Sequence, residues 1–511
     1  MAKNNIMSHF RESLESIVVS ANQMSQIEGR IFEAGMPVAA LMEKAAGIVA
    51  TRIQQLYPFQ KVSIGVLVGP GHNGGDALVV ARELHLQGYS ISIYQPFSKL
   101  KELTLQHARY TNSLGIPHHQ TIQALQECEL IIDGLFGFGL ERSLTSDLAD
   151  AVNLLNQWQK PVISIDIPSG IHTDTGAVLG AAVKATHTLC LGLWKRAIFQ
   201  DTALEYIGKA ERLDFGIPHS DVWAILGQNP LIQQITPTLA RSFLPLPRPL
   251  VTHKYKQGHL LLICGSSRYA GGAILAGLGA RGSGVGMLSI AVPTSLKPLL
   301  VSHLPEALII DCPETETGAI AQLPSLSQYD IIACGPGLTQ DAETIIEQVL
   351  QSEQPLVLDA DGLNILAKLG ISKISTRQNP TILTPHLGEF KRLFPSIENL
   401  DRISAVSEAA RQSGAIVLFK GARTAIAHPD GKIWLIPQST PALARGGSGD
   451  ILTGLLGGLL AQSKQPVDKT VAIAAWLHSQ AGIKAAKDKT ELGVDGITLA
   501  QYINLAVSEL L

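Results

Sequence analysis

The chain has 511 residues, with 40 Lys and Arg against 43 Asp and Glu, and a formal net charge of −3 at pH 7. Near-neutrality excludes the basic footprint of nucleic-acid-binding and anionic-membrane-binding proteins, and the length excludes a single small binding module. Hydrophobic residues make up 46% and charged residues only 16%, which predicts large buried cores and a small-molecule partner.

The cysteines and the N-terminal segment bear on the compartment. Five scattered cysteines without CxxC spacing are typical of buried thiols in a reducing environment. Met1–Arg11 lacks the apolar core of a signal peptide, and no apolar run approaches the ~20 residues that span a bilayer. We therefore expect a cytoplasmic protein without a membrane or nucleic-acid partner.

The first half opens with helical periodicity over Met24–Arg52 and continues with short β-branched runs that alternate with amphipathic stretches. This alternation predicts a mostly parallel sheet in a Rossmann-like three-layer α/β domain over residues 1–225. The expected strands are Lys61–Gly69, Ser90–Tyr94, Leu130–Asp133, Val162–Asp166 and Thr186–Leu191.

Five prolines interrupt the segment Ala224–His253, where we expect the domain boundary. A second α/β domain, over residues 226–511, is predicted from another strand-and-helix series. Its expected strands are His259–Gly265, Met287–Val292, Asp330–Gly335, Leu356–Asp359, Thr381–Thr384 and Ile416–Lys420, followed by helices over Gly449–Gln462 and Lys469–Ala486.

The segment GPGHNGGD satisfies the dinucleotide fingerprint through Gly69, Gly71 and Gly74. Two features argue against an ordinary Rossmann cofactor site. No acid ends the next strand to bind a ribose, and Asp76 lies near the helix start, where a phosphate would bind.

Polar residues also follow two later strands, as Asp133 before GLFGFG, and as Asp166 and Ser169 in DIPSG. Because ligands bind outside the carboxyl ends of parallel strands, we expect these residues to meet Asn73 in one crevice. An amide, two carboxylates and a hydroxyl are oxygen donors that suit a hard cation.

The ordered set GPGHNGGD, DGLFGFG and DIPSG resembles the YjeF N-terminal domain, the epimerase of hydrated nicotinamide nucleotides, over roughly residues 15 to 220. The resemblance implies potassium ligands at Asn73, Asp133 and Ser169, and we expect Asp166 to be the acid/base group. His72 and Ala77 depart from the family pattern. The implied substrate-binding residues are Gly74, Gly75, Asp76, Gly137, Phe138, Gly139, Leu140, Glu141, Arg142, Ser143 and Asp166.

The densest signal of the second half is ARGGSGDILTG, a glycine-rich turn before an apolar helix that lacks the Lys and Ser/Thr of a Walker A loop. The N–H groups of Gly446–Gly449 can form an anion cradle at the helix N-terminus. Asp450 beside that cradle can take a proton from a hydroxyl that attacks a terminal phosphate.

This motif resembles the ribokinase-like superfamily. Together with HKYKQGH, GSSRYAGGA, CGPGL, LDADGLN, TPHLGEF and KGART, it resembles the YjeF C-terminal domain, an NAD(P)H-hydrate dehydratase, over about residues 240 to 511. Leu387, Arg445, and Ser439 or Thr440 depart from the family pattern. The resemblance implies that the adenine nucleotide is held by Lys420, Gly421, Ala422, Arg423, Thr424 and Gly449, and the hydrated substrate by Ala273, Gly337, His386 and Asp450.

The two resemblances together imply a bifunctional enzyme that epimerises the R and S forms of NADHX and NADPHX and dehydrates the S form to NAD(P)H. The expected donor is ADP, with ATP as the alternative, and the expected products are AMP and phosphate. We expect Mg²⁺ at the transferred phosphoryl, K⁺ in the epimerase site, Asp166 and Asp450 as catalytic residues, and a homo-oligomer.

Two other functions stay open from the residues alone. A kinase of a small vitamin or sugar shares the Gly-Asp turn and would release a stable phosphorylated product. A binding or scaffold protein could retain the first half as a recognition domain without catalysis.

Overall fold

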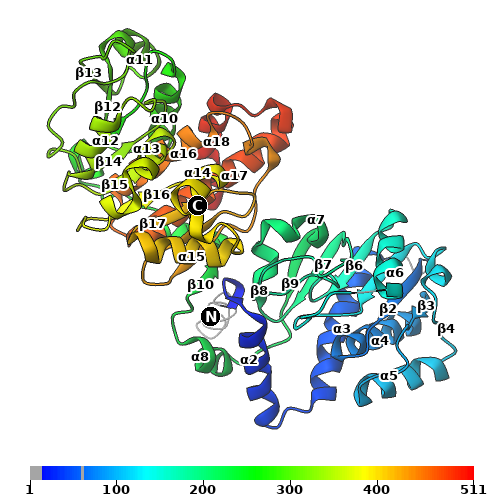
Figure 1. Ribbon diagram of the computed structural model, residues 1–511. Coiled ribbons are helices and arrows are strands. Elements are labelled where there is room, and N and C mark those ends of the chain that lie inside the picture. The colour runs from blue at the N-terminus through cyan, green and yellow to red at the C-terminus, as the bar shows by residue number, and fades with distance from the viewer. Residues whose placement is uncertain (1–13, 59–61, 145) are drawn as a thin grey trace. The chain divides into compact units, whose positions relative to one another are not determined.

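The computed structural model describes residues 14–58, 62–144 and 146–511, so the expectations for Met1–Arg11 and for Lys61 lie outside the described residues. The chain divides into two compact units, the first ending at Pro230 and the second starting at Leu231 (Figure 1). Each unit has its own sheet and its own hydrophobic core.

The first unit is built on a seven-stranded parallel sheet in the order β4-β3-β2-β5-β6-β7-β9. The order reverses between β2 and β5, so their carboxyl ends open a crevice at the switch point. The strands are β2 (Ser63–Val68), β3 (Ser90–Tyr94), β4 (His118–His119), β5 (Leu130–Gly134), β6 (Val162–Ile165), β7 (His187–Leu191) and β9 (Lys209–Leu213).

Helices cover both faces of this sheet, which gives the predicted three layers (Figure 1). One face packs against α2 (Ala21–Glu33), α3 (Val38–Leu56), α4 (His72–Leu86), α5 (Glu102–Ser113) and α8 (His219–Leu226), and the other against α6 (Ser146–Gln157) and η1 (Ile122–Leu125). The short helix α7 (Leu204–Ile207) precedes β9, and β1 (Val18–Val19) pairs with β8 (Trp194–Lys195) in a separate small sheet.

The second unit contains a ten-stranded sheet in the order β10-β19-β18-β17-β16-β15-β14-β11-β12-β13. It is parallel except where β18 pairs with β17 and β19, and its order reverses beside β11. The strands are β10 (Ile232–Gln234), β11 (His259–Ile263), β12 (Met287–Pro293), β13 (Leu308–Cys312), β14 (Ile331–Cys334), β15 (Leu356–Leu358), β16 (Thr381–Leu383), β17 (Ile416–Phe419), β18 (Ala425–Ala427) and β19 (Ile433–Leu435).

Apolar helices form the main core of this unit on one face of the sheet. They are α9 (Pro237–Phe243), α10 (Ala270–Ser283), α11 (Lys297–His303), α16 (Ser448–Gln462), α17 (Val467–Lys489) and α18 (Gly496–Leu510). Four further α-helices lie between β14 and β17. In chain order, α12 (Glu343–Leu350) follows β14, α13 (Asp361–Leu369) follows β15, and both α14 (Leu387–Leu393) and α15 (Arg402–Ser413) lie between β16 and β17.

The α/β class predicted for both halves is confirmed, because each unit is built on a wholly or mostly parallel sheet with helices between its strands. Every expected strand is present within two residues of its predicted bounds. The sequence analysis missed β1, β4, β8, β9, β10, β13, β18 and β19, most of them two or three residues long or at a sheet edge, because so few residues show no periodicity.

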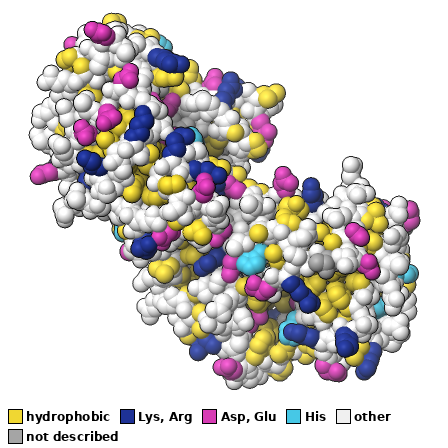
Figure 2. Space-filling model, viewed as in Figure 1, with side chains coloured by type: hydrophobic (Ala, Val, Ile, Leu, Met, Phe, Trp, Pro, Cys, Tyr) yellow, Lys and Arg dark blue, Asp and Glu magenta, His cyan; other side chains and the backbone are white. Residues whose placement is uncertain are grey.

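Further observations concern the charged surface, the cysteine thiols and the apolar character of the helices. On the face shown in Figure 2, basic and acidic side chains are interspersed. All five cysteines are buried and free. Within the described residues, no helix is both long and apolar enough to cross a membrane.

Candidate functional site

The carboxyl ends of β5 and β6 bring two predicted cation ligands together in the first unit. Ser169 donates from its Oγ to Asp133 Oδ1 at 2.6 Å and from its backbone N–H to Asp133 Oδ2 at 2.9 Å. Ser164 Oγ and the Leu135 N–H also donate to this carboxylate, at 2.8 and 3.3 Å. Burial raises the pKa of Asp133, and these hydrogen bonds lower it in part.

Asn73, the third predicted cation ligand, lies in the first turn of α4. Its Nδ2 is buried and has no hydrogen-bond partner within the described part of the chain. A Cβ on Gly137 would lie 3.1 Å from Asn73 Oδ1 and 3.2 Å from Asp166 Oδ2. The amide of Asn73 and the carboxylate of Asp166 therefore approach each other across a glycine that leaves the space free.

Asp166 directly follows β6 and has a left-handed conformation, with φ +70°, which is strained for a residue with a side chain. Its Oδ1 accepts from Lys195 Nζ at 2.5 Å and from the Leu191 N–H at 3.3 Å, and its Oδ2 accepts from the Phe138 N–H at 3.0 Å. The sequence analysis missed Lys195, which is fully buried on β8. Lys195 and the neighbouring Arg196 are the two charged residues of the apolar stretch Leu189–Phe199, and this pattern does not predict a contact with Asp166.

A cavity of about 750 Å³ opens over these residues. Of the predicted ligand and substrate-binding residues, those that line it are Asn73, Asp76, Gly137, Phe138, Gly139, Leu140, Glu141, Arg142 and Asp166. The other predicted residues of this unit, which are Asp133, Ser169, Gly74, Gly75 and Ser143, are not among the lining residues. A Cβ on Gly74 would lie 1.9 Å from the Gly69 carbonyl oxygen, so this glycine permits the close strand-to-helix turn.

Two further carboxyls of the cavity lie in surroundings that favour the protonated form. Glu28 on α2 has a pKa raised to about 7, because burial outweighs the lowering by Lys195, and Asp166 raises it further. Burial, with the charges of Asp166 and Glu28, raises the pKa of Asp76 well above its usual range. Sequence analysis placed Asp76 in the site but did not find Glu28.

In the second unit, the glycine-rich turn leads directly into α16, which begins at Ser448 with Gly447 at φ +91° as its N-cap. The first N–H groups of a helix lack intrahelical acceptors, so this turn can bind an anion. Asp450 lies in the first turn, and its pKa is raised to about 6, chiefly by burial and then by the charge of Asp359.

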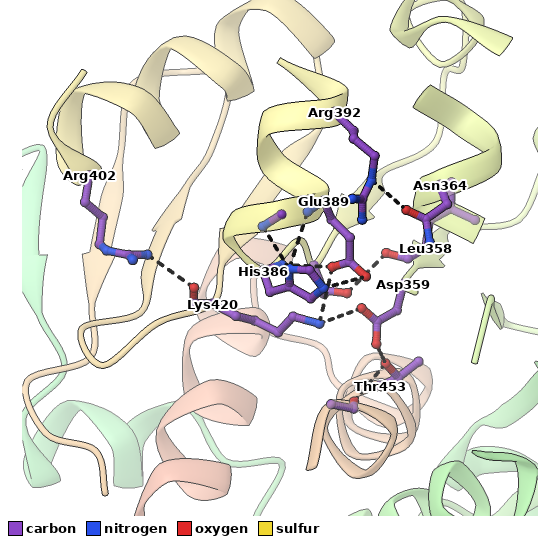
Figure 3. Close-up of polar contacts among 12 residues, drawn as sticks. Leu358, Asp359, Asn364, His386, Glu389, Arg392, Arg402, Lys420 and Thr453 are labelled. Atoms are coloured by element: carbon purple, nitrogen blue, oxygen red, sulfur yellow. Dashed lines mark hydrogen bonds and ion pairs between the residues drawn. The ribbon is translucent and has the colours of Figure 1, made fainter. Parts of the chain in front are cut away.

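Figure 3 shows the polar network beside this turn. Lys420, after β17, lies with its Nζ 2.8 Å from Asp359 Oδ1, after β15. Thr453 donates to Asp359 Oδ2 at 2.6 Å, and its hydroxyl also lies 3.1 Å from the Gly449 carbonyl oxygen. A Cβ on Gly449 would lie 3.5 Å from Lys420 Nζ, so the ammonium lies at the anion-binding turn.

His386 caps α14, and its Nδ1 accepts from the N–H groups of Gly388 at 2.9 Å and Glu389 at 3.3 Å. Glu389 in turn accepts from the His386 backbone N–H at 2.9 Å, which completes a capping box (Figure 3). With Nδ1 as acceptor, the proton is on Nε2. Burial raises the pKa of Glu389 to about 7, and Lys420, 3.9 Å away, lowers it in part.

Three other residues predicted to bind substrate or nucleotide, Gly337, Ala273 and Thr424, lie in different surroundings: a gap beside Asp450, the hydrophobic core and a surface turn. A Cβ on Gly272 would lie 3.6 Å from both Asp450 Oδ2 and the Gly337 nitrogen, so Gly337 and Asp450 face one gap. Ala273 is fully buried, and its side chain packs in the core. Thr424 Oγ1 closes the turn Lys420–Thr424 by contacts with Gly421 O (3.2 Å) and Gly421 N–H (3.4 Å).

Arg445, one of the residues that depart from the family pattern, donates to the carbonyl oxygens of Leu492 and Val494, both at 3.1 Å. It therefore covers the loop before α18. Sequence analysis quoted the segments of Asp359, Glu389 and Thr453 but did not place these residues in the site. The sequence feature that could have identified Asp359 is an acidic residue at the end of the predicted strand Leu356–Asp359.

Comparison with known proteins gives two family matches. Residues 38–197 match the family described as YjeF-related protein N-terminus, and residues 260–505 match the family described as NAD(P)H-hydrate dehydratase. Among solved structures, the ADP/ATP-dependent NAD(P)H-hydrate dehydratase from Bacillus subtilis, co-crystallised with ATP/Mg²⁺, is 34% identical, covers 54% of this chain and 98% of its own, and has a TM-score of 0.48.

Two relatives match nearly the whole chain, and both are bifunctional NAD(P)H-hydrate repair enzymes named Nnr. The protein from Synechocystis sp. is 56% identical over 95% of this chain and 94% of its own length. The protein from Thermosynechococcus vestitus is 50% identical over 93% of this chain and 94% of its own length. The chain therefore belongs to the bifunctional NAD(P)H-hydrate repair enzymes, which join an NAD(P)H-hydrate epimerase domain to an NAD(P)H-hydrate dehydratase domain.

Proposed function

We propose that the first unit epimerises NADHX and NADPHX at the cavity of Asp166, and that the second unit dehydrates the S form at Asp450 with an adenine nucleotide as phosphoryl donor. The observation that carries the dehydratase assignment is the position of Asp450 in the first turn of α16, beside Lys420 and facing Gly337 across a gap. A general base, a cation and free helix N–H groups meet there.

Dehydration in this site starts from a poor leaving group, because the substrate carries a hydroxyl. Asp450 takes the hydroxyl proton as the oxygen attacks the terminal phosphoryl of the nucleotide. The helix N–H groups and the Lys420 ammonium stabilise the charge that develops on the phosphoryl oxygens. The bond between the terminal phosphoryl and the rest of the nucleotide breaks, so ADP leaves AMP behind. Phosphate then leaves the substrate as the neighbouring ring carbon loses a proton, which restores the double bond of the reduced nicotinamide ring.

ADP is the proposed donor, and the turn Lys420–Thr424 with Gly449 is the proposed nucleotide site. Mg²⁺ bound with a nucleotide keeps several waters and is coordinated largely by the phosphates, so it needs few protein ligands beside the cradle. The ion would neutralise the transferring phosphoryl. Within the described residues, no group of three or more His, Cys, Asp and Glu side chains is arranged to hold a metal ion.

K⁺ is the proposed cation of the first unit. Asp133 is buried, and no cationic side chain contributes to its pKa shift, so a monovalent cation would supply the missing positive charge. The oxygen donors of Asp133, Ser169 and Asn73 suit such an ion. There it would fix the loop Gly137–Arg142 over the cavity.

The quaternary structure and the compartment are separate proposals. We propose a homo-oligomer, which light scattering of the full chain checks. We also propose a cytoplasmic location. The five free cysteines are consistent with a reducing compartment, and cell fractionation tests the proposal.

The deciding experiment follows the recovery of reduced-nicotinamide absorbance from a mixed-epimer NADHX sample, supplied with Mg²⁺ and either ADP or ATP. Wild type should recover all of the signal with its true donor, and Asp450→Asn should recover none. Asp166→Asn should recover the S form quickly and the R form only at its spontaneous rate. Absence of recovery with both nucleotides, with accumulation of a phosphorylated product from another hydroxyl compound, would replace the dehydratase with a small-molecule kinase.

A further inference from the structure

Glu28 lies on the inward face of α2, four residues after the buried Met24 and three residues before the buried Ile31. A carboxyl at this helical spacing points toward the protein rather than the solvent. Glu28 lines the 750 Å³ cavity together with Asp76, Asp166 and Lys195. It lies outside the matched segment 38–197 and outside every motif of the sequence analysis.

The two carboxyls Glu28 and Asp166 share this cavity but differ in their partners. Asp166 receives hydrogen bonds from the Lys195 ammonium and from two backbone N–H groups, which fix the orientation of its side chain. The side chain of Glu28 makes no hydrogen bond or ion pair with any described residue. A carboxyl without donors in a partly apolar cavity retains its proton more readily.

We propose that Glu28 is the proton donor of the epimerase reaction and that Asp166, held in place by Lys195, is the proton acceptor. The inference rests on the proposed function of the first unit and names the second acid/base group that the reaction needs. Lys195 is in this scheme a positioning residue that holds the Asp166 side chain in place.

The chemistry of the substrate requires both groups. Hydration of an enamine places the hydroxyl on the ring carbon that is bonded to nitrogen. Glu28 gives a proton to this hydroxyl, the carbon–oxygen bond breaks, and water leaves while the nitrogen lone pair forms a carbon–nitrogen double bond. Water then adds to the opposite face of the same carbon and gives a proton to Asp166. Transfer of that proton back to Glu28 restores the enzyme without an oxidant or reductant.

The electrostatic surroundings of Glu28 agree with this role. Burial is the largest cause that brings the pKa of Glu28 to about 7, Lys195 lowers it, and Asp166 raises it. A donor with a pKa near the working pH is the most effective one. The titratable and charged groups that face the same cavity are His72, Asp76, Lys101, Glu141, Arg142, Asp166 and Lys195.

Glu28→Gln, with Glu33→Gln as a matched control on the exposed side of the same helix, tests the inference in the full-length chain. Chromatographic separation of the epimers gives kcat and KM for epimerisation across a pH series. Glu28→Gln should lower kcat by roughly 10² to 10⁴ while KM changes little. The fall of the wild-type rate as pH rises through about 7 should be absent in this variant. Glu33→Gln should behave as wild type.

Dehydration of the pure S form in the same preparations shows whether each variant is folded. Should Glu28→Gln not fold, Glu28→Asp replaces it, and the shorter acid should keep the alkaline fall of the rate with a reduced kcat. The inference is overturned if Glu28→Gln keeps the wild-type kcat, or if its rate still falls as pH rises through about 7. If Asp76→Asn loses epimerisation and Glu28→Gln keeps it, the proton donor is Asp76. The proposed function itself fails only if wild type does not epimerise, so the two failures are distinct.

Discussion

Asp359 and Asp450 lie in one site but differ in their partners. Asp359 is buried and receives hydrogen bonds from Lys420 and Thr453, and the charge of Lys420 is the main cause that lowers its pKa against the effect of burial. Asp450 has no such pair, and burial raises its pKa to about 6. The two environments separate a fixed anion from a group that can accept a proton near neutral pH.

The pH dependence of dehydration should report the raised pKa of Asp450. The base acts only when ionised, so kcat/KM should be lost as pH falls through about 6 and reach a plateau above it. The measurement is the initial rate of NADH recovery from the S form across a pH series. A rate that stays constant below pH 6 would contradict the assignment of Asp450 as the base.

Removal of the Asp359 carboxylate should affect both stability and nucleotide binding. Asp359→Asn leaves Lys420 without its closest anion, which should lower the free energy of unfolding by about 3 kcal/mol and weaken nucleotide affinity. Asp361→Asn is the stability control, because an asparagine oxygen can still accept from the Thr339 N–H. Urea unfolding and calorimetric titration with ADP measure the two effects. Equal stability of both variants would mean that the buried pair is unimportant.

The packing of α10 against α16 positions the glycine-rich turn at the start of α16. A Cβ on Gly454 would lie 1.8 Å from the Ala276 carbonyl oxygen, and one on Gly279 would lie 2.1 Å from the Ile451 carbonyl oxygen. The two helices therefore touch through their backbones, which only glycine permits. This close packing sets Asp450 opposite the start of α10.

Gly454→Ala should force α16 away from α10 and lower the free energy of unfolding by roughly 1 to 3 kcal/mol. Dehydration should fall while epimerisation is retained, because the change lies within the second unit. Gly271→Ala, on α10, is the stability control, since a Cβ there meets nothing within 4 Å. Thermal unfolding and both activity assays are the measurements. A Gly454→Ala variant as stable as Gly271→Ala would show that the helices can separate at no cost.

At the scale of the whole molecule, the two candidate sites are built by separate sheets and separate cores. Each site lies at the carboxyl ends of its own parallel strands, beside its own reversal of strand order. The residues proposed as catalytic belong to one unit in each case, with Glu28 and Asp166 in the first and Asp450 in the second. The two activities should therefore be separable in the intact chain.

A mixture of Asp166→Asn and Asp450→Asn chains tests this separation. Each variant supplies the activity that the other lacks, so the mixture should recover all NADHX of a mixed-epimer sample. The time course of absorbance, compared with wild type at the same number of active sites, is the measurement. A much slower recovery by the mixture would show that the epimer passes between the two sites of one chain.

The amino-acid sequence by itself determined the elements and the polar residues at their ends. Asp133, Asp166 and Asp359 each follow a short apolar run, and parallel strands place such positions on one edge, so local patterning predicted which regions meet. The glycine-rich turn before α16 was likewise visible as a local motif. Strands of two or three residues were not predicted, because so few residues show no measurable hydrophobic period.

Only the tertiary structure decided which side chains are neighbours within each site. Lys195 reaches Asp166 from β8, Glu28 faces the same cavity from α2, and Lys420 pairs with Asp359 across 61 positions of sequence. Burial also decided that Glu28 and Asp450 have raised pKa values. Protonation and pairing depend on desolvation and on distances between segments far apart in the chain, and no local pattern contains either quantity.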